Sequence, residues 1–162
     1  MIIRNAKLDE VLIIKSTYEN AKKFMRQSGH MHQWTGDYPS IELIPRDILG
    51  HNCFVYEEEN EILGVFCLFK GPDITYEKIY NGAWISDSDY YVIHRIAMNV
   101  HGKGIAQKCF DYGMSKNNHL RIDTHKDNIP MQRALLKYGF KQCGIIYLES
   151  GDERIAFEKL GE

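Results

Sequence analysis

The glycine-rich turn His101-Gly102-Lys103-Gly104-Ile105-Ala106 has residue types and spacing that suit phosphate chemistry. An apolar, β-branched stretch from Tyr90 precedes it, and a helix-like run from Gln107 follows it. A strand, a glycine turn and a helix in this order present free backbone N–H groups to a phosphate, because glycine allows close approach and a helix N-terminus carries partial positive charge. Lys103 adds a full charge at the rim. We expect a phosphate-bearing ligand here, with an ordinary strand-to-helix connection as the alternative.

Two common phosphate loops do not match this turn. A Walker loop requires Gly, four residues and then Gly-Lys-Ser/Thr, which the chain lacks. The dinucleotide fingerprint requires a third glycine three residues after Gly104, where the chain has Gln107. The turn must therefore belong to another class.

A second informative stretch begins at Asn128 and ends with Gly139-Phe140. Asn128 and Pro130 are typical of a helix start, and Gly139 is typical of a helix stop. Together with the glycine turn, this stretch resembles the GNAT superfamily, the acetyl-CoA-dependent N-acetyltransferases. That family combines a Gln/Arg-x-x-Gly-x-Gly/Ala loop with an Asn-started helix ending in Gly-Phe. The order of elements also fits, so the resemblance covers nearly the whole chain.

The resemblance implies a cofactor, acetyl-CoA, and the residues that would hold it. The family's central strand is bulged and splayed from its neighbour, and its backbone pairs with the acetyl and pantetheine parts of acetyl-CoA. Ile96 and Met98 would supply those groups here, and Asn128 would bond the pantetheine from the opposite side of the gap. The pyrophosphate would be held by the amides of His101, Gly102, Lys103, Gly104, Ile105 and Ala106. No metal is implied.

Four departures from the family pattern stand out. Val92 occupies a position where some members carry a glutamate base, and Leu135 occupies the position of a common tyrosine acid. His101 stands where Gln or Arg is usual, and the segment between Met98 and His101 is shorter than in similar proteins. Neither the standard base nor the standard acid can therefore be carried over.

His94 is the candidate general base that the residues themselves suggest. Histidine titrates near neutral pH, and strand alternation places His94 on the face of Ile96 unless a bulge intervenes. A structural histidine is the alternative. The backbone N–H of Ile96 is the candidate donor to the oxyanion. Arg95 points to the other face, where we expect it to pair with a carboxylate.

Aromatic and polar residues in two loop regions are candidates for binding the acceptor. Such side chains suit either a small-molecule amine or a peptide N-terminus, although Trp34 and Tyr38 can equally plug the edge of the core. They are Gln33, Trp34, Tyr38, Tyr76 and Trp84.

Composition places the chain among ordinary globular proteins. It has 162 residues, 44% hydrophobic and 26% charged, with a net charge of -2. No basic excess indicates a nucleic-acid or membrane partner, and no signal peptide is evident, so we expect a cytoplasmic protein.

The four cysteines form no Cys-x-x-Cys pair, which favours buried free thiols over zinc ligands or disulfides. Dimers are common among similar proteins, so a homodimer is compatible with the resemblance.

Periodicity predicts one α/β domain over residues 1–162, with a mixed, mostly antiparallel sheet flanked by helices. The resemblance to the GNAT superfamily further implies a splayed strand pair in that sheet. Helices are expected over 8–27, 45–49, 104–116 and 128–138. Strands are expected over 2–4, 53–57, 62–70, 90–99, 119–124, 140–148 and 154–157.

Three functions are compatible with these observations. The first is an N-acetyltransferase that moves acetyl from acetyl-CoA to a primary amine by direct attack in a ternary complex. The second is a catalytically silent acyl-CoA-binding sensor or interaction module, which Val92 and Leu135 favour. The third is a protein without a CoA site, whose glycine turn is structural.

Overall fold

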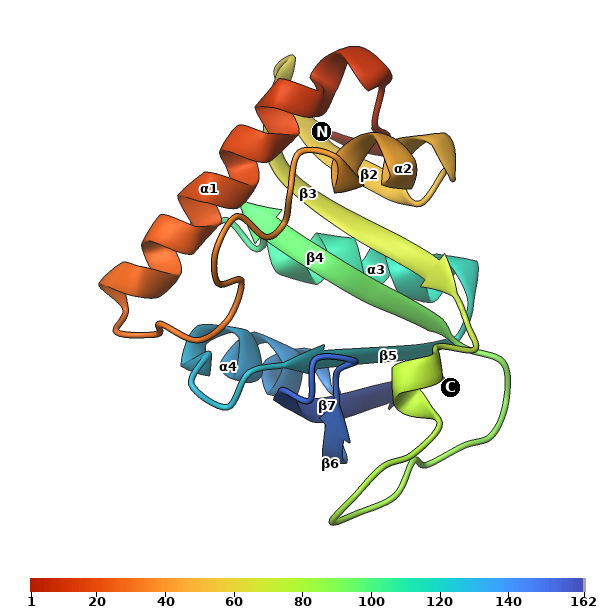
Figure 1. The fold of residues 1–162 in the computed structure, drawn as a ribbon. Helices are drawn as coiled ribbons and strands as arrows, with labels where there is room; N and C mark the ends of the chain where they lie inside the picture. The colour runs from red at the N-terminus through yellow and green to blue at the C-terminus, as the bar shows by residue number, and fades with distance from the viewer. Residues whose placement is uncertain (162) are drawn as a thin grey trace. The chain divides into compact units, whose positions relative to one another are not determined.

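Seven strands form one sheet in the hydrogen-bonded order β1-β2-β3-β4-β5-β7-β6 (Figure 1). The computed structural model describes residues 1–161. The strands are β1 (Ile2–Asn5), β2 (Cys53–Glu58), β3 (Glu61–Lys70), β4 (Tyr91–Met98), β5 (His119–Thr124), β6 (Lys141–Tyr147) and β7 (Glu153–Leu160). The helices are α1 (Val11–Gln27), α2 (Leu43–Leu49), α3 (Ile105–Lys116) and α4 (Ile129–Tyr138), with 3-10 turns at Leu8–Glu10 and Ile74–Tyr76.

The strand pairings confirm the predicted mixed, mostly antiparallel sheet. β4 and β5 pair in parallel through Tyr91 with Leu120 and Val92 with Arg121. The β1–β2, β2–β3, β5–β7 and β6–β7 pairs are antiparallel. The sequence pattern thus predicted the fold class correctly.

Local sequence signals explain where most elements begin and end. The β2–β3 hairpin turns at Glu59 and Asn60, whose φ angles of 52° and 62° are typical of a two-residue turn that matches strand twist. Asn128 caps α4 by accepting a hydrogen bond from the Met131 N–H at 3.3 Å. Gly139 ends the helix at φ 111°.

Most predicted boundaries differ from the structure by one to three residues, and the second helix is an example. We expected the short second helix to start at Pro45, but α2 starts at Leu43. Proline is tolerated anywhere in a first turn, because the N–H it lacks has no partner within the helix there. Pro45 therefore marks the first turn of α2 rather than its first residue.

The chain divides into two compact units built from interleaved segments. Unit 1 comprises Met1–Leu68 and His94–Tyr112, and unit 2 comprises Phe69–Ile93 and the chain from Gly113 onward. The single-domain organisation expected from the sequence stays a prediction. Unit 1 has buried side chains that include Ile14, Tyr18, Ile44, Val55 and Phe66, and unit 2 has a core cluster of Tyr76, Val92, Ile146 and Ala156.

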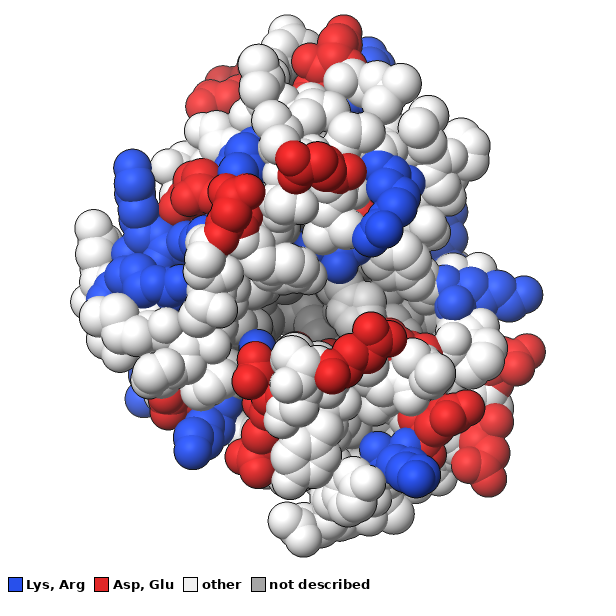
Figure 2. Space-filling model, in the orientation of Figure 1, with Lys and Arg blue, Asp and Glu red and all other residues white. Residues whose placement is uncertain are grey.

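Charge is mixed on the surface. Figure 2 shows acidic and basic side chains interspersed over the face in view, with a basic group over α1. Among residues 1–161, no helix has both the length and the apolar character needed to cross a membrane.

Candidate active site

The end of β4 in unit 1 has an irregular backbone. Arg95 lies in the middle of the strand with φ 51°, a left-handed conformation that costs a non-glycine residue about 1–3 kcal/mol. This irregularity interrupts simple alternation between His94 and Ile96. Alternation was expected to place His94 and Ile96 on one face only in the absence of a bulge, so their shared face stays a prediction.

The Arg95 side chain makes an ion pair with a carboxylate, as the sequence led us to expect. The Nη2 of Arg95 donates to both carboxylate oxygens of Asp47 at 2.9 Å, and its Nε donates to Oδ2 at 3.2 Å. Asp47 comes from α2 and is 4% exposed. Burial opposes the charge of Arg95, but its neighbours, including Asp47, hold the pKa of Arg95 above its ordinary value. The Nη1 of Arg95 also donates to the Tyr38 hydroxyl at 3.3 Å.

The glycine turn that follows β4 is exposed and left-handed at both glycines. Gly102 has φ 81° and Gly104 has φ 70°, and a Cβ added at either position would meet nothing within 4 Å. These two positions therefore favour glycine because of their backbone conformation, since a side chain there would have room. The Gly104 carbonyl accepts from the Lys108 N–H at 3.2 Å, which begins α3. A turn of this kind at a helix start offers unsatisfied N–H groups to an anion.

Close packing sets the position of the first helical residue. Ile105 is 2% exposed, and a Cβ built on Gly64 of β3 would lie 3.1 Å from its side chain. Gly64 therefore allows the start of α3 to approach the sheet. His101, at the beginning of the turn, stacks on Phe24 of α1 with ring centroids 3.8 Å apart.

The candidate acceptor residues fall in both units. In unit 1, Gln33 bonds to the His30 ring at 3.2 Å and Trp34 packs edge-on against Tyr18 at 5.6 Å. Tyr38 contacts Arg95 as described and is 42% exposed. Acceptor binding by these residues stays a prediction.

The two candidates of unit 2 make contacts in its interior. Tyr76 is 1% exposed and donates to Asp123 at 2.7 Å, and burial raises its pKa well above the ordinary value. The Trp84 Nε1 donates to the Tyr76 carbonyl at 2.9 Å. These contacts give both residues a packing role, and a binding role for them stays a prediction.

Two of the positions that depart from the family pattern belong to the core. Val92 and Leu135 are each 0% exposed. His94 is partly exposed, and Asn128 is 9% exposed at the cap of α4. Val92 and Leu135 are apolar and cannot transfer a proton. A general acid or base of this protein must therefore be a residue at another position.

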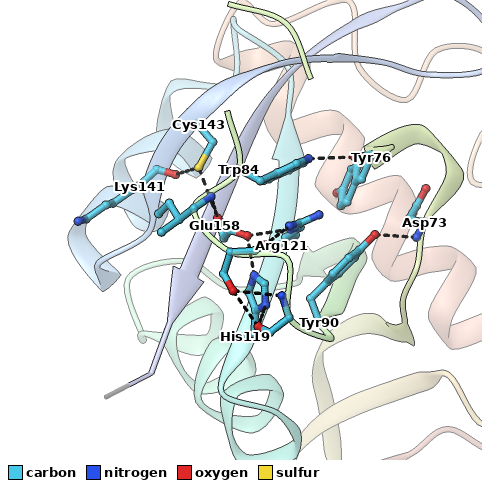
Figure 3. Close-up of polar contacts among 12 residues, drawn as sticks. Asp73, Tyr76, Trp84, Tyr90, His119, Arg121, Lys141, Cys143 and Glu158 are labelled. Atoms are coloured by element: carbon cyan, nitrogen blue, oxygen red, sulfur yellow. Dashed lines mark hydrogen bonds and ion pairs between the residues drawn. The ribbon is translucent and has the colours of Figure 1, made fainter. Parts of the chain in front are cut away.

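Unit 2 contains a buried charge cluster that the sequence analysis missed. Glu158 of β7 is 0% exposed and accepts from the Arg121 Nε at 2.8 Å, from the His119 ring and from the Ile85 N–H (Figure 3). The Arg121 guanidinium lies 4.0 Å from the Trp84 ring centroid and 4.1 Å from that of Tyr90. The signal was present: polar residues alternate with Leu120 and Ile122 in this strand, which predicts that positions 119 and 121 share one face.

Comparison with known proteins adds independent information. No protein-family model matches the chain, and no curated protein matches it. Among solved structures, an acetyltransferase of the GNAT family from Streptococcus agalactiae 2603 is 32% identical, with a TM-score of 0.89, covering 99% of this chain and 95% of that one.

Two more distant structures share the fold. A putative acetyltransferase from Staphylococcus aureus Mu50 is 24% identical with a TM-score of 0.72, covering 99% of both chains. A GNAT-family acetyltransferase from Listeria monocytogenes 4b F2365 is 18% identical with a TM-score of 0.73, covering 99% of this chain and 94% of that one. The likeness to the streptococcal protein extends over nearly the full length of both chains. The chain belongs to the GNAT family of acetyltransferases.

Proposed function

We propose that the protein is an acetyl-CoA-dependent N-acetyltransferase acting on a primary amine of a small molecule or peptide. The observation that carries the proposal is the irregular end of β4, which leads into the exposed glycine turn at the start of α3. Membership of a family of acetyltransferases supports acetyl transfer in general. The acceptor and the mechanism are part of the proposal.

The turn fits the phosphates of acetyl-CoA. Its glycines adopt φ angles that favour glycine, the space above them is open, and Lys103 is exposed beside them. Ile96 and Met98 would bind the pantetheine and acetyl parts through their backbone groups, and Asn128 would add a further contact. Acetyl-CoA supplies an activated acetyl group and a thiol leaving group whose pKa is about 8.5.

The protein's own contribution would be orientation and proton transfer. An alkyl ammonium has a pKa of about 10.4, so the amine must lose a proton before it attacks the acetyl carbon. We assign that proton to His94. The Ile96 N–H would donate to the acetyl oxygen as the C–N bond forms and the C–S bond breaks.

One observation favours a second function. Val92 and Leu135, at the positions of the family's usual base and acid, are fully buried apolar residues. A catalytically silent acyl-CoA-binding module would have no need for those groups. It would bind CoA without releasing thiol.

The deciding experiment combines binding with turnover. Calorimetry measures acetyl-CoA affinity, and a free-thiol assay measures turnover with a panel of small amines, amino acids and peptides with free N-termini. The N-acetyltransferase predicts saturable thiol release with at least one amine. Binding without release across the panel would favour the silent module, and absence of binding would contradict both.

A matched pair of glycine variants tests the position of the loop. Gly104→Glu places a carboxylate in the phosphate site, and we expect at least tenfold weaker acetyl-CoA binding from charge repulsion at close range. Gly151→Glu is the control, since Gly151 has φ 89° and open space around it but lies in the β6–β7 turn. Equal affinities in the two variants would mean that the phosphate site lies elsewhere.

A further inference from the structure

Asn99, the residue that directly follows β4, uses its whole side-chain amide in hydrogen bonds. Its Nδ2 donates to the Ile62 carbonyl at 3.0 Å and to the Thr17 Oγ1 at 3.1 Å. Its Oδ1 accepts from the Asn20 Nδ2 at 2.9 Å. The backbone N–H of Asn99 donates to the Leu63 carbonyl at 2.8 Å. The amide therefore ties the start of the glycine turn to both β3 and α1.

The α1 side of this connection is itself well defined. Thr17 is 0% exposed, and its hydroxyl donates to the Ile13 carbonyl at 3.0 Å, which leaves a lone pair for Asn99. Thr17, Asn20 and Phe24 are spaced by three and four residues, so they lie on one face of the helix. Phe24 stacks on His101, so this face of α1 contacts both Asn99 and His101. These two residues flank Val100 in the chain.

The turn needs such a support. Gly102 and Gly104 are exposed, and glycine loses more conformational freedom on ordering than any other residue. A binding loop that is already ordered avoids that cost when the ligand binds. Only Val100 and His101 separate Asn99 from Gly102, so the position of Asn99 strongly constrains where the glycines lie.

We infer that Asn99 is a positioning residue for the phosphate part of acetyl-CoA, acting through the glycine turn that it holds against α1. This inference rests on the proposed function. It goes beyond that proposal by naming the groups that fix the conformation of the glycine turn. These groups are the Asn99 side-chain amide and the α1 side chains of Thr17, Asn20 and Phe24. Asn99 acts by fixing the loop and makes no contact with the reacting atoms.

The test uses two thioester probes on the full chain. Acetyl-CoA carries the phosphates, and S-acetylpantetheine lacks them. For Asn99→Ala we expect about tenfold weaker binding and a correspondingly higher KM for acetyl-CoA, with kcat changed less than twofold. The kcat/KM for S-acetylpantetheine should change less than twofold, because that probe does not use the loop.

Conservative variants guard against a simple folding defect. Thr17→Ser keeps the hydroxyl and should bind acetyl-CoA like the wild type, whereas Thr17→Val should weaken binding several-fold. Asn20 is exposed on a helix where alanine is well tolerated, so Asn20→Ala should fold normally and weaken binding a few-fold. Calorimetry and thermal unfolding are measured for each variant.

The outcomes separate this inference from the proposed function. A wild-type protein that does not bind acetyl-CoA overturns both. Wild-type binding with unchanged affinity in Asn99→Ala, Thr17→Val and Asn20→Ala overturns the inference alone. Equal losses with acetyl-CoA and S-acetylpantetheine would also overturn it, because they would show a general structural role.

Discussion

At the scale of single residues, Arg95 shows how one buried ion pair can maintain an unfavourable backbone conformation. The left-handed φ would relax in a free strand, but three hydrogen bonds from the guanidinium to Asp47 fix it. The carboxylate of Asp47 also accepts from the Cys67 thiol at 3.5 Å. A local change at Asp47 should therefore affect the very strand to which we assign acetyl transfer.

Replacing Asp47 tests this dependence. Asp47→Asn leaves the Arg95 charge buried without a counter-charge, and we expect the free energy of unfolding to fall by about 3–5 kcal/mol. Urea unfolding measures the change. Asp37→Asn is the control, because Asp37 is exposed in its pair with Lys15 and such pairs contribute about 0–1 kcal/mol. Equal stabilities of the two variants would argue against a structural role for the Asp47 pair.

His94 allows a prediction about catalysis at the same scale. His94→Ala should lower kcat by roughly 10²-fold or more, the usual contribution of a general base, while acetyl-CoA affinity changes less than threefold. Thiol release at saturating substrate and calorimetry give the two values. If turnover is unchanged, His94 is a structural residue and another group accepts the proton.

At the scale of elements, the free edge of β6 is covered by a segment from the long connection before β4. Tyr80 and Ile145 exchange both backbone hydrogen bonds at 2.8 Å, and the Ala83 N–H donates to the Cys143 carbonyl at 3.0 Å. An uncovered edge strand exposes backbone groups that can pair with another chain. The segment that contains Tyr80 and Ala83 thus connects β3 with β4 and also covers backbone groups at the edge of β6.

Gly82 makes this cover sterically possible. A Cβ at Gly82 would lie 1.8 Å from the Cys143 carbonyl oxygen, so Gly82→Ala must push the segment off β6. We expect the free energy of unfolding to fall by about 1–3 kcal/mol or more, as in other overpacked sites.

Gly50→Ala is the control for this variant. Its added Cβ meets chiefly the Asn52 side-chain amide, which can move. Urea unfolding should rank wild type and Gly50→Ala well above Gly82→Ala. Similar stability of the two variants would show that the segment can detach from β6 without penalty.

At the scale of the whole molecule, both units bury groups that ionise at alkaline pH. Burial raises the pKa of Cys109 to about 12, and burial together with the Glu158 charge raises that of Cys143 to about 11. The pKa values of Tyr18 and Tyr76 are raised mainly by burial too. In each case the native protein favours the neutral form more than the unfolded chain does.

Stability should therefore fall at alkaline pH. A raised pKa contributes stability that is fully present below the unfolded value, near 9 for a thiol, and is lost as pH rises towards the folded value. For Cys109 alone the loss is about 1.4 kcal/mol per pH unit. Urea unfolding at pH 8, 9 and 10.5 should show a decline that Cys109→Ala makes shallower. An unchanged slope in that variant would mean that the Cys109 thiol is not protected.

The sequence by itself determined the turns and helix ends, because these features depend on residues that are close together in the chain. The hairpin turn at Glu59 and Asn60, the Asn128 cap, the Gly139 stop and the glycine turn follow from backbone preferences of single residues. For the same reason nearly every helix and strand was predicted within a few residues. Their order, with the two motifs, indicated the GNAT family correctly.

Only the tertiary structure decided which distant side chains meet. Arg95 meets Asp47 across 48 residues, Arg121 meets Glu158 across 37, and Asn99 meets Thr17 across 82. Such pairs depend on strand register and helix packing, which no local pattern specifies. The irregular backbone at Arg95 arises in the same way, because a carboxylate from another element stabilises a conformation that the strand sequence alone disfavours.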